Sequence, residues 1–263
     1  MNHAFLFDET ITFEERALRV FSFQYTRNPV FRRFCDALDT NPGNVSSPED
    51  IPLLPVEAFR NAECTCWPGE EHDLVFRSSG TTGMKRSRHP VKDMELYAES
   101  VTRGMSEFYN LDDYVILACT PGYNDNPDSS LVWMLNYLIG LDQSGLSRFL
   151  PVDQFQGHGH GHAHEHVKEH VKEHEKGKGR GQGQIRDGEE PESDKKPVLG
   201  AGLNREELVR ITASGKKLML FGAAFGLIDM AEARPLKLPP DSLIVETGGM
   251  KTHRREMGRE EMH

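Results

Sequence analysis

A run of hydroxyl and glycine residues is the part of the chain best suited to bind a charged ligand. It consists of Ser78, Ser79, Gly80, Thr81, Thr82 and Gly83. The glycines permit left-handed turns, and the hydroxyls and backbone N–H groups can face one anion. Basic side chains follow closely, namely Lys85, Arg86, Arg88 and His89. The combination predicts a loop that binds the β- and γ-phosphates of ATP, with a plain surface turn as the alternative.

The spacing of the glycines distinguishes this loop from the Walker A motif. Two residues separate Gly80 from Gly83, whereas Walker A has four between its glycines, followed by Gly-Lys-Ser/Thr. A second glycine-bearing loop follows the last expected strand. It contains Gly248, Gly249, Met250 and Lys251, and its alternative interpretation is an ordinary strand-to-helix turn.

Alternating strand and helix patterns around these loops predict an α/β fold. Strands are expected at 73–77, 114–119, 217–221 and 243–246, and helices at 92–109, 129–141, 205–213 and 224–233. Such alternation is typical of a mostly parallel sheet flanked by helices. Because ligands bind beyond the carboxyl ends of the strands in such sheets, loops 78–83 and 247–251 are both expected at that edge.

Residues 1–72 are expected to form a helical segment that packs on this core. Thr12 and Glu15 have the spacing of a capping box, and Pro29 is suited to the first turn of a second helix. Apolar residues recur every four positions in the first helix, at Phe13, Ala17, Phe21 and Tyr25. Four prolines and a glycine between residues 39 and 56 predict a loop there.

Residues 157–196 differ in composition from the rest. They hold seven of the 12 histidines and no aromatic residue, which predicts a disordered insertion between the core segments 73–156 and 197–263. The histidines alternate from His158 to His166 and then step by four to His174. This pattern is compatible with binding of Zn²⁺, Ni²⁺ or Cu²⁺, although no catalytic metal site is expected.

The composition of the whole chain excludes several classes of protein. Its 263 residues include 31 Lys and Arg against 41 Asp and Glu, a net charge of −10, so no overall positive field attracts nucleic acid or an anionic membrane. No apolar run reaches the ~18 residues that span a bilayer, and no secretory signal is expected. Four cysteines without framework spacing predict a cytoplasmic protein with reduced thiols.

Other reactive or apolar residues leave alternatives open. Cys64 and Cys66 are either a metal or redox pair or two unrelated thiols. Cys119 is predicted to be a buried small hydrophobic residue. One apolar set either belongs to the core or lines an acyl pocket: Trp133, Met134, Phe221, Phe225 and Leu227.

Four segments in the same order resemble LuxE-type acyl-protein synthetases, a bioluminescence-related family of the acyl-adenylate-forming superfamily. They are residues 51–59, 76–83, 87–89 and 245–251. The resemblance covers most of the chain outside 157–196. It implies a fold that is the N-terminal part of the large domain of adenylate-forming enzymes.

The resemblance implies an ATP-dependent ligase that converts a carboxylic acid, with a long-chain fatty acid as the expected substrate, into an acyl-adenylate for transfer to a protein thiol. Ser78 to Gly83 would hold the phosphates of Mg²⁺-bound ATP with Arg88 and His89 beside them, and Gly248 to Lys251 would contact adenine. An acyl-accepting or acyl-donating protein is an expected partner. The alternatives are an acyl- or aryl-CoA ligase and a non-catalytic nucleotide-binding remnant with a metal-binding His-rich segment.

The same resemblance implies that further family segments lie beyond His263. These are the Tyr-Gly-x-Thr-Glu segment that helps to hold Mg²⁺, the small domain with its catalytic lysine, and the acylated cysteine. The chain is therefore expected to be an N-terminal portion, whose activity on its own is open.

Overall fold

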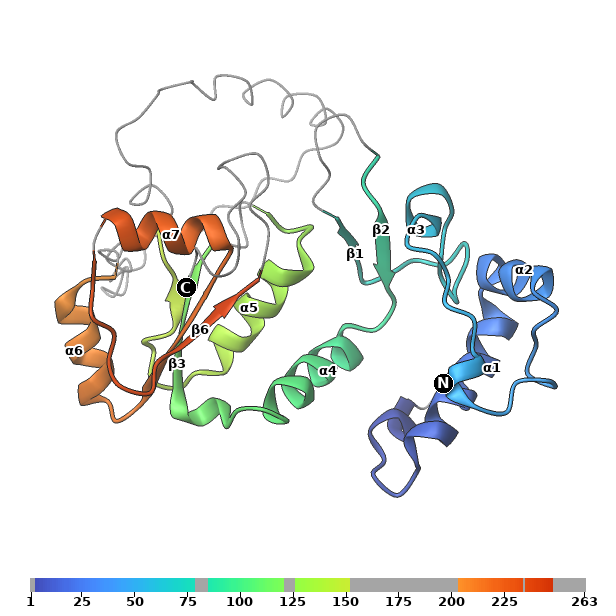
Figure 1. The fold of residues 1–263 in the computed structure, drawn as a ribbon, viewed down its shortest axis with the longest axis horizontal. Coiled ribbons are helices and arrows are strands. Elements are labelled where there is room, and N and C mark those ends of the chain that lie inside the picture. The colour runs from blue at the N-terminus through green and yellow to red at the C-terminus, as the bar shows by residue number, and fades with distance from the viewer. Residues whose placement is uncertain (1–2, 79–84, 121–125, 152–202, 234, 248–263) are drawn as a thin grey trace, which may run out of the picture.

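The computed structural model describes residues 3–78, 85–120, 126–151, 203–233 and 235–247 (Figure 1). Its largest sheet has four parallel strands in the order β4–β3–β5–β6. The strands are β3 (Tyr114–Cys119), β4 (Arg148–Phe149), β5 (Lys217–Gly222) and β6 (Leu243–Glu246). The α/β prediction is therefore confirmed, with three of these strands at their expected positions.

Helices cover both faces of the parallel sheet, α4 (Met94–Ser106) and α5 (Ser130–Leu141) on one face and α6 (Arg205–Ala213) and α7 (Ala224–Ala233) on the other. Because successive side chains of a strand point to opposite faces, Leu117 packs with Ile211 of α6, whereas Ile116 packs with Leu135 of α5. Burial on both faces explains why β3 and β5 are apolar almost throughout.

The N-terminal segment contains α1 (Phe13–Arg27), α2 (Pro29–Ala37) and α3 (Ala58–Asn61). It also contains the 3-10 turns η1 (His3–Phe7) and η2 (Pro48–Asp50), and a third turn, η3 (Leu111–Asp113), precedes β3. Thr12 caps α1 by accepting from the Glu15 N–H at 3.2 Å, and α2 begins at Pro29 as predicted. The two helices enclose a small core of their own around Phe21 and Phe31.

Phe13 does not belong to that core, contrary to the four-residue pattern, because 71% of its surface is exposed. An α-helix has 3.6 residues per turn, so residues spaced by four drift by about 40° at each step. Phe13 and Phe21 therefore differ by about 80° around the helix axis.

Two strands were not predicted, and one of them changes the setting of the first loop. β1 (Leu74–Arg77) pairs antiparallel with β2 (Arg88–Val91) in a separate two-stranded sheet. The prediction that loop 78–83 follows a strand of the parallel sheet is thus wrong. β2 was missed because it contains Pro90, and proline, which lacks an N–H, is confined to edge strands. The other missed strand, β4, has only two residues.

Candidate anion-binding site

The expected phosphate-binding loop lies between β1 and β2, where Ser78 and Ser87 hold its two ends together. The Ser78 N–H donates to the Ser87 carbonyl at 3.1 Å, and the Ser87 N–H donates to the Ser78 Oγ at 3.0 Å. Nε of Arg86 donates to the Ser78 carbonyl at 2.6 Å. These three bonds fix both ends of the segment 79–84, and we refer to residues 77–78 and 85–89 as the hairpin neck.

Positive charge is concentrated at the hairpin neck. Residues 77–89 contain three arginines, one lysine and no acidic residue, although the chain as a whole is acidic. Arg77 and Arg88 occupy directly opposite positions in the β1–β2 register. Arg77 forms an ion pair with Asp128 at 3.2 Å, whereas the exposed side chain of Arg88 makes no hydrogen bond or ion pair with any residue that the structure describes. The hairpin neck can therefore accept negative charge from a ligand.

His89 is held in a defined orientation beside these arginines. Its Nε2 lies 3.0 Å from the Ser87 Oγ, and its ring stacks on Phe59 of α3 with centroids 5.0 Å apart and planes at 25°. Ser87 itself is buried. The imidazole is thus fixed from two sides before any ligand arrives. Phe59 was not predicted as a site residue, although it ends the segment 51–59 on which the family resemblance partly rests.

The structure brings together three of the predicted phosphate-binding residues, Ser78, Arg88 and His89. The others, Ser79, Gly80, Thr81, Thr82 and Gly83, lie outside the described residues. The predicted adenine loop, Gly248 to Lys251, and the His-rich insertion 157–196 also lie outside them. The structure therefore describes the two ends of the predicted phosphate loop, at Ser78 and at residues 85–89.

The second glycine-bearing loop starts at the carboxyl edge of the parallel sheet, as predicted. Thr247 follows β6, and its N–H and Oγ1 donate to the Gly222 carbonyl at the end of β5, at 3.0 and 3.2 Å. The hairpin is joined to the same body, since the Arg77 N–H donates to the carbonyl of Asp128 at 2.9 Å, just before α5. Figure 1 shows β1 beside the amino end of α5, where the Phe76 and Trp133 rings make contact.

The proposed acyl-pocket residues do not line one cavity. Phe221 packs against α5 on one face of the sheet, whereas Leu227 packs against the opposite face. Trp133 stacks on Tyr137, with centroids 5.4 Å apart, and also contacts Tyr97. Met134 packs on the same side as Phe221, and the side chain of Phe225 lies outside the description. The core interpretation of this set therefore fits the structure better than the acyl pocket.

A cavity of about 380 Å³ lies between the N-terminal helices and β2. Its walls include Phe31, Leu54, Phe59, Cys66 and Pro90. Phe59 thus borders this mostly apolar space while it also stacks on His89. No periodic pattern in the sequence predicts this cavity, because its walls come from loops and from separate helices.

The four cysteines form no disulfide and lie in poorly reactive surroundings. Cys64 and Cys119 are buried, the latter as predicted, and Cys66 is half-buried. Burial raises the pKa of the Cys64 and Cys66 thiols, which lowers the fraction of the thiolate that binds metals or attacks carbonyls. Across the described ranges, no three His, Cys, Asp or Glu side chains are grouped so that they could hold a metal ion.

The described residues of the hairpin neck do not provide a carboxylate that is available to bind Mg²⁺. This ion usually binds one or two carboxylates together with substrate phosphates. Asp128, the carboxylate that contacts the hairpin neck, is already paired with Arg77. Any Mg²⁺ at this site would therefore arrive as part of the Mg·ATP substrate.

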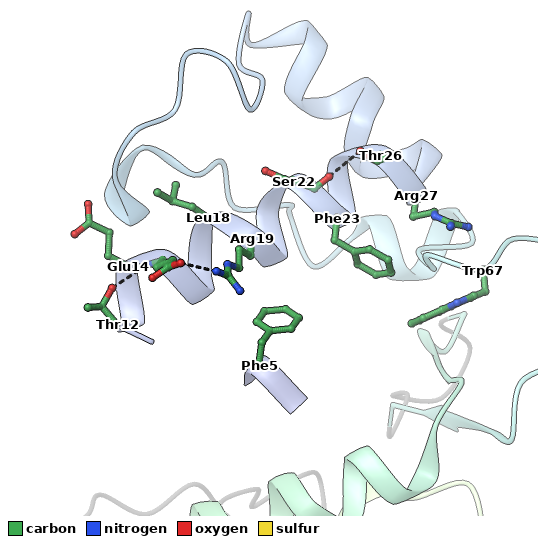
Figure 2. A pocket seen from close by; sticks show the side chains of 11 residues that line it. Phe5, Thr12, Glu14, Leu18, Arg19, Ser22, Phe23, Thr26, Arg27 and Trp67 are labelled. Atoms are coloured by element: carbon green, nitrogen blue, oxygen red, sulfur yellow. Dashed lines mark hydrogen bonds and ion pairs between the residues drawn. The ribbon is translucent and has the colours of Figure 1, made fainter. Parts of the chain in front are cut away.

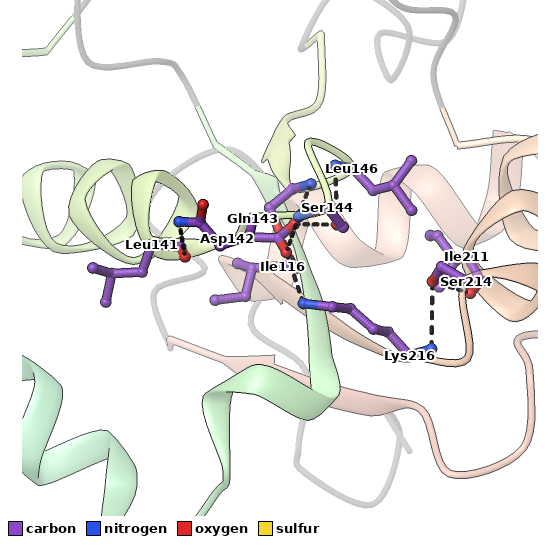
Figure 3. A network of polar contacts seen from close by, with 10 residues as sticks. Ile116, Leu141, Asp142, Gln143, Ser144, Leu146, Ile211, Ser214 and Lys216 are labelled. Carbon is purple, nitrogen blue, oxygen red and sulfur yellow. Dashed lines mark hydrogen bonds and ion pairs between the residues drawn. The ribbon is translucent and has the colours of Figure 1, made fainter.

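A buried polar network that was not predicted from the sequence lies at the amino ends of the parallel strands (Figure 3). The Asp142 carboxylate accepts hydrogen bonds from Lys216 at 2.8 Å and from the Ser147 hydroxyl at 2.7 Å, and the Ile116 N–H of β3 donates to the same hydroxyl. Burial alone would raise the pKa of Asp142, but its bonds to Lys216, Ser144 and Ser147 outweigh burial and hold that pKa well below its usual range. Asp142 thus links β3, β5 and the α5–β4 loop, which is a structural role.

No family model, curated protein or solved structure matches the chain. Within the described part of the chain, no helix is long and apolar enough to cross a membrane.

Proposed function

We propose that this chain activates a carboxylic acid, with a long-chain fatty acid as its substrate, by forming an acyl-adenylate from ATP. We also propose that the chain belongs to the LuxE-type acyl-protein synthetases and has the large-domain fold of adenylate-forming enzymes. In that fold the loop that contacts adenine would consist of Gly248, Gly249, Met250 and Lys251. One observation supports it most. Arg77 and Arg88 oppose each other at the ends of a Ser/Thr/Gly loop, and only Arg77 has an acidic partner among the described residues.

The reaction matches the charge of the hairpin neck. A carboxylate oxygen attacks the α-phosphorus of ATP, the bond from that phosphorus to the bridging oxygen breaks, and pyrophosphate leaves with the bonding electrons. A thiol then takes the acyl group, and AMP leaves. Fixed positive groups aimed at the charge of a leaving group lower the barrier for such a step. In this proposal Arg88 pairs with the departing pyrophosphate, and the oriented His89 ring donates a hydrogen bond beside it.

Exchange of labelled pyrophosphate into ATP tests the proposal, because it occurs only when the acyl-adenylate forms reversibly. The full chain is incubated with Mg·ATP, labelled pyrophosphate and either palmitate or benzoate. We expect exchange with palmitate. We also expect about tenfold slower exchange in Arg88→Gln, since one charged donor to the leaving group is lost.

Arg210→Gln is the matched control, because Arg210 is an exposed arginine of α6, outside the hairpin. Equal loss in both variants, or undiminished exchange in Arg88→Gln, would contradict the assigned role of the hairpin. Exchange with benzoate alone would replace the fatty acid by an aryl acid, as in the CoA-ligase alternative. ATP binding by folded protein without any exchange would leave the nucleotide-binding remnant as the correct description.

A further inference from the structure

A broad groove of about 1070 Å³ runs along one side of α1 (Figure 2). Aromatic rings from three parts of the chain face it, namely Phe5 of η1, Phe23 of α1 and Trp67 from the loop that follows α3. The Phe23 and Trp67 rings lie 5.9 Å apart, and Leu18 adds an aliphatic wall. The groove thus offers a long apolar surface at the upper end of the usual size of ligand pockets.

The charges along the groove differ from one end to the other. Glu14 and Glu15 lie at the first turn of α1, where Glu15 pairs with Arg19, and Arg19 also stacks over the Phe5 ring at 5.8 Å. Arg27 lies at the opposite end near Trp67 (Figure 2). Its side chain is exposed and forms no hydrogen bond or ion pair with the described part of the chain.

The positive charge of Arg27 acts on the residues at the Trp67 end of the groove. Burial raises the pKa of the Cys66 thiol next to Trp67 in sequence, and the Arg27 charge opposes that rise. The Arg27 end of the groove is therefore positive, whereas the Glu14 end is negative. An elongated ligand with a single anionic head would bind in one direction only.

We infer that the groove binds a single-chain amphiphile, with its alkyl chain along Phe23, Leu18 and Phe5 and its anionic head beside Arg27. Apolar surface removed from water supplies the affinity, and the charge on Arg27 selects the head group. The fatty-acid carboxylate and the alkyl phosphate share this chemistry. Because the groove does not include the hairpin neck, its binding is independent of the proposed adenylation.

Direct binding without ATP tests the inference. The probes share a twelve-carbon chain and differ in their heads: dodecanoate, dodecyl phosphate, dodecyl maltoside and dodecyltrimethylammonium, all kept below micelle formation. We expect the two anions to bind about fivefold more tightly than the neutral maltoside and the cation to bind most weakly, since an exposed charge pair contributes a factor of that order. The relative affinities of carboxylate and phosphate identify the preferred source.

Variants locate the binding site within the chain. Arg27→Gln should lower the affinity for dodecanoate to that for the maltoside, whereas Arg33→Gln, at an exposed arginine of α2, should not. Ser22→Phe should block all four probes, because Ser22 lines the groove near the middle of α1 and a phenyl ring there would fill it.

Tryptophan fluorescence gives a second readout. Bromododecanoate should quench the protein through contact with Trp67, so quenching should survive Trp133→Phe and disappear in Trp67→Phe. Circular dichroism of each variant shows whether a loss of signal reflects unfolding. Calorimetric titration of the unmodified chain measures binding independently of fluorescence. No binding by the unmodified chain, equal affinity for all heads, or quenching that persists in Trp67→Phe would each overturn the inference.

Discussion

Arg77 and Arg88 face each other across the last paired position of the β1–β2 hairpin, yet the structure gives an acidic partner to Arg77 alone, Asp128 at 3.2 Å. Like charges directly opposite on paired strands are destabilising. A ligand with several negative charges would remove this repulsion and gain two cationic contacts at once. The hairpin neck therefore has an electrostatic reason to bind a phosphate group.

Removing the Arg88 charge should separate ligand binding from stability. In Arg88→Gln we expect the free energy of unfolding of the free protein to be unchanged or higher by a few tenths of a kcal/mol, about the size of one cross-strand repulsion. Pyrophosphate should raise the melting temperature of the unmodified chain by binding the folded state, but not that of Arg88→Gln. Thermal unfolding with and without pyrophosphate measures both effects, and an equal rise in the two proteins would remove Arg88 from the site.

Phe59 should act through His89 as a positioning residue. Phe59→Ala removes the stacked ring, so we expect slower acid-dependent pyrophosphate exchange together with a loss of stability of about 1–3 kcal/mol. Phe59→Tyr keeps the ring and should restore exchange to near the original rate. Phe108→Ala is the control, since Phe108 is 80% exposed. If Phe59→Tyr were as slow as Phe59→Ala, stacking on His89 would not be the reason.

Asp142 should make the stability of the fold depend on acid. The side chain of Asp142 is 4% exposed and that of its partner Lys216 is 22% exposed. We expect Asp142→Asn to lower the free energy of unfolding by about 2–4 kcal/mol at neutral pH, because Lys216 and two serine hydroxyls lose a charged acceptor.

The sign of the pH effect follows from the lowered pKa of Asp142 in the folded state. A carboxyl with a lowered folded pKa contributes its full stability above its unfolded pKa of about 3.9 and loses it as the pH falls toward the folded value. The difference between the unmodified chain and Asp142→Asn should therefore shrink below about pH 5. Urea unfolding at several pH values measures it, with exposed Asp112→Asn as the control. A difference that does not change with pH would contradict the network.

The regular elements of the fold were predictable because their patterns are local. The apolar runs of β3 and β5 and the cap at Thr12 each reflect a rule that acts over a few residues. Strand pairing is not local, so the antiparallel partner of β1 was missed. Pro90 in β2 reads as a break in a strand, and its tolerance depends on the edge position that only the fold reveals.

The candidate site was predictable in its residue types but not in its arrangement. Ser78, Arg88 and His89 were identified from hydroxyl, glycine and basic residues close together in sequence. The stacking of Phe59 on His89 and the pairing of Arg77 with Asp128 join residues 30 or more positions apart, which no spacing rule connects. The charged end of the α1 groove was missed for the same reason, since Arg27 and Trp67 meet only in the folded chain.

Titration of Mg·ATP into the folded full chain by calorimetry tests the central claim most directly. We predict saturable binding at one site, weakened in Arg88→Gln and retained in Arg210→Gln. Absence of any heat of binding from protein that circular dichroism shows to be folded, or equal affinity in all three proteins, would contradict the claim that this hairpin holds the phosphates of a nucleotide.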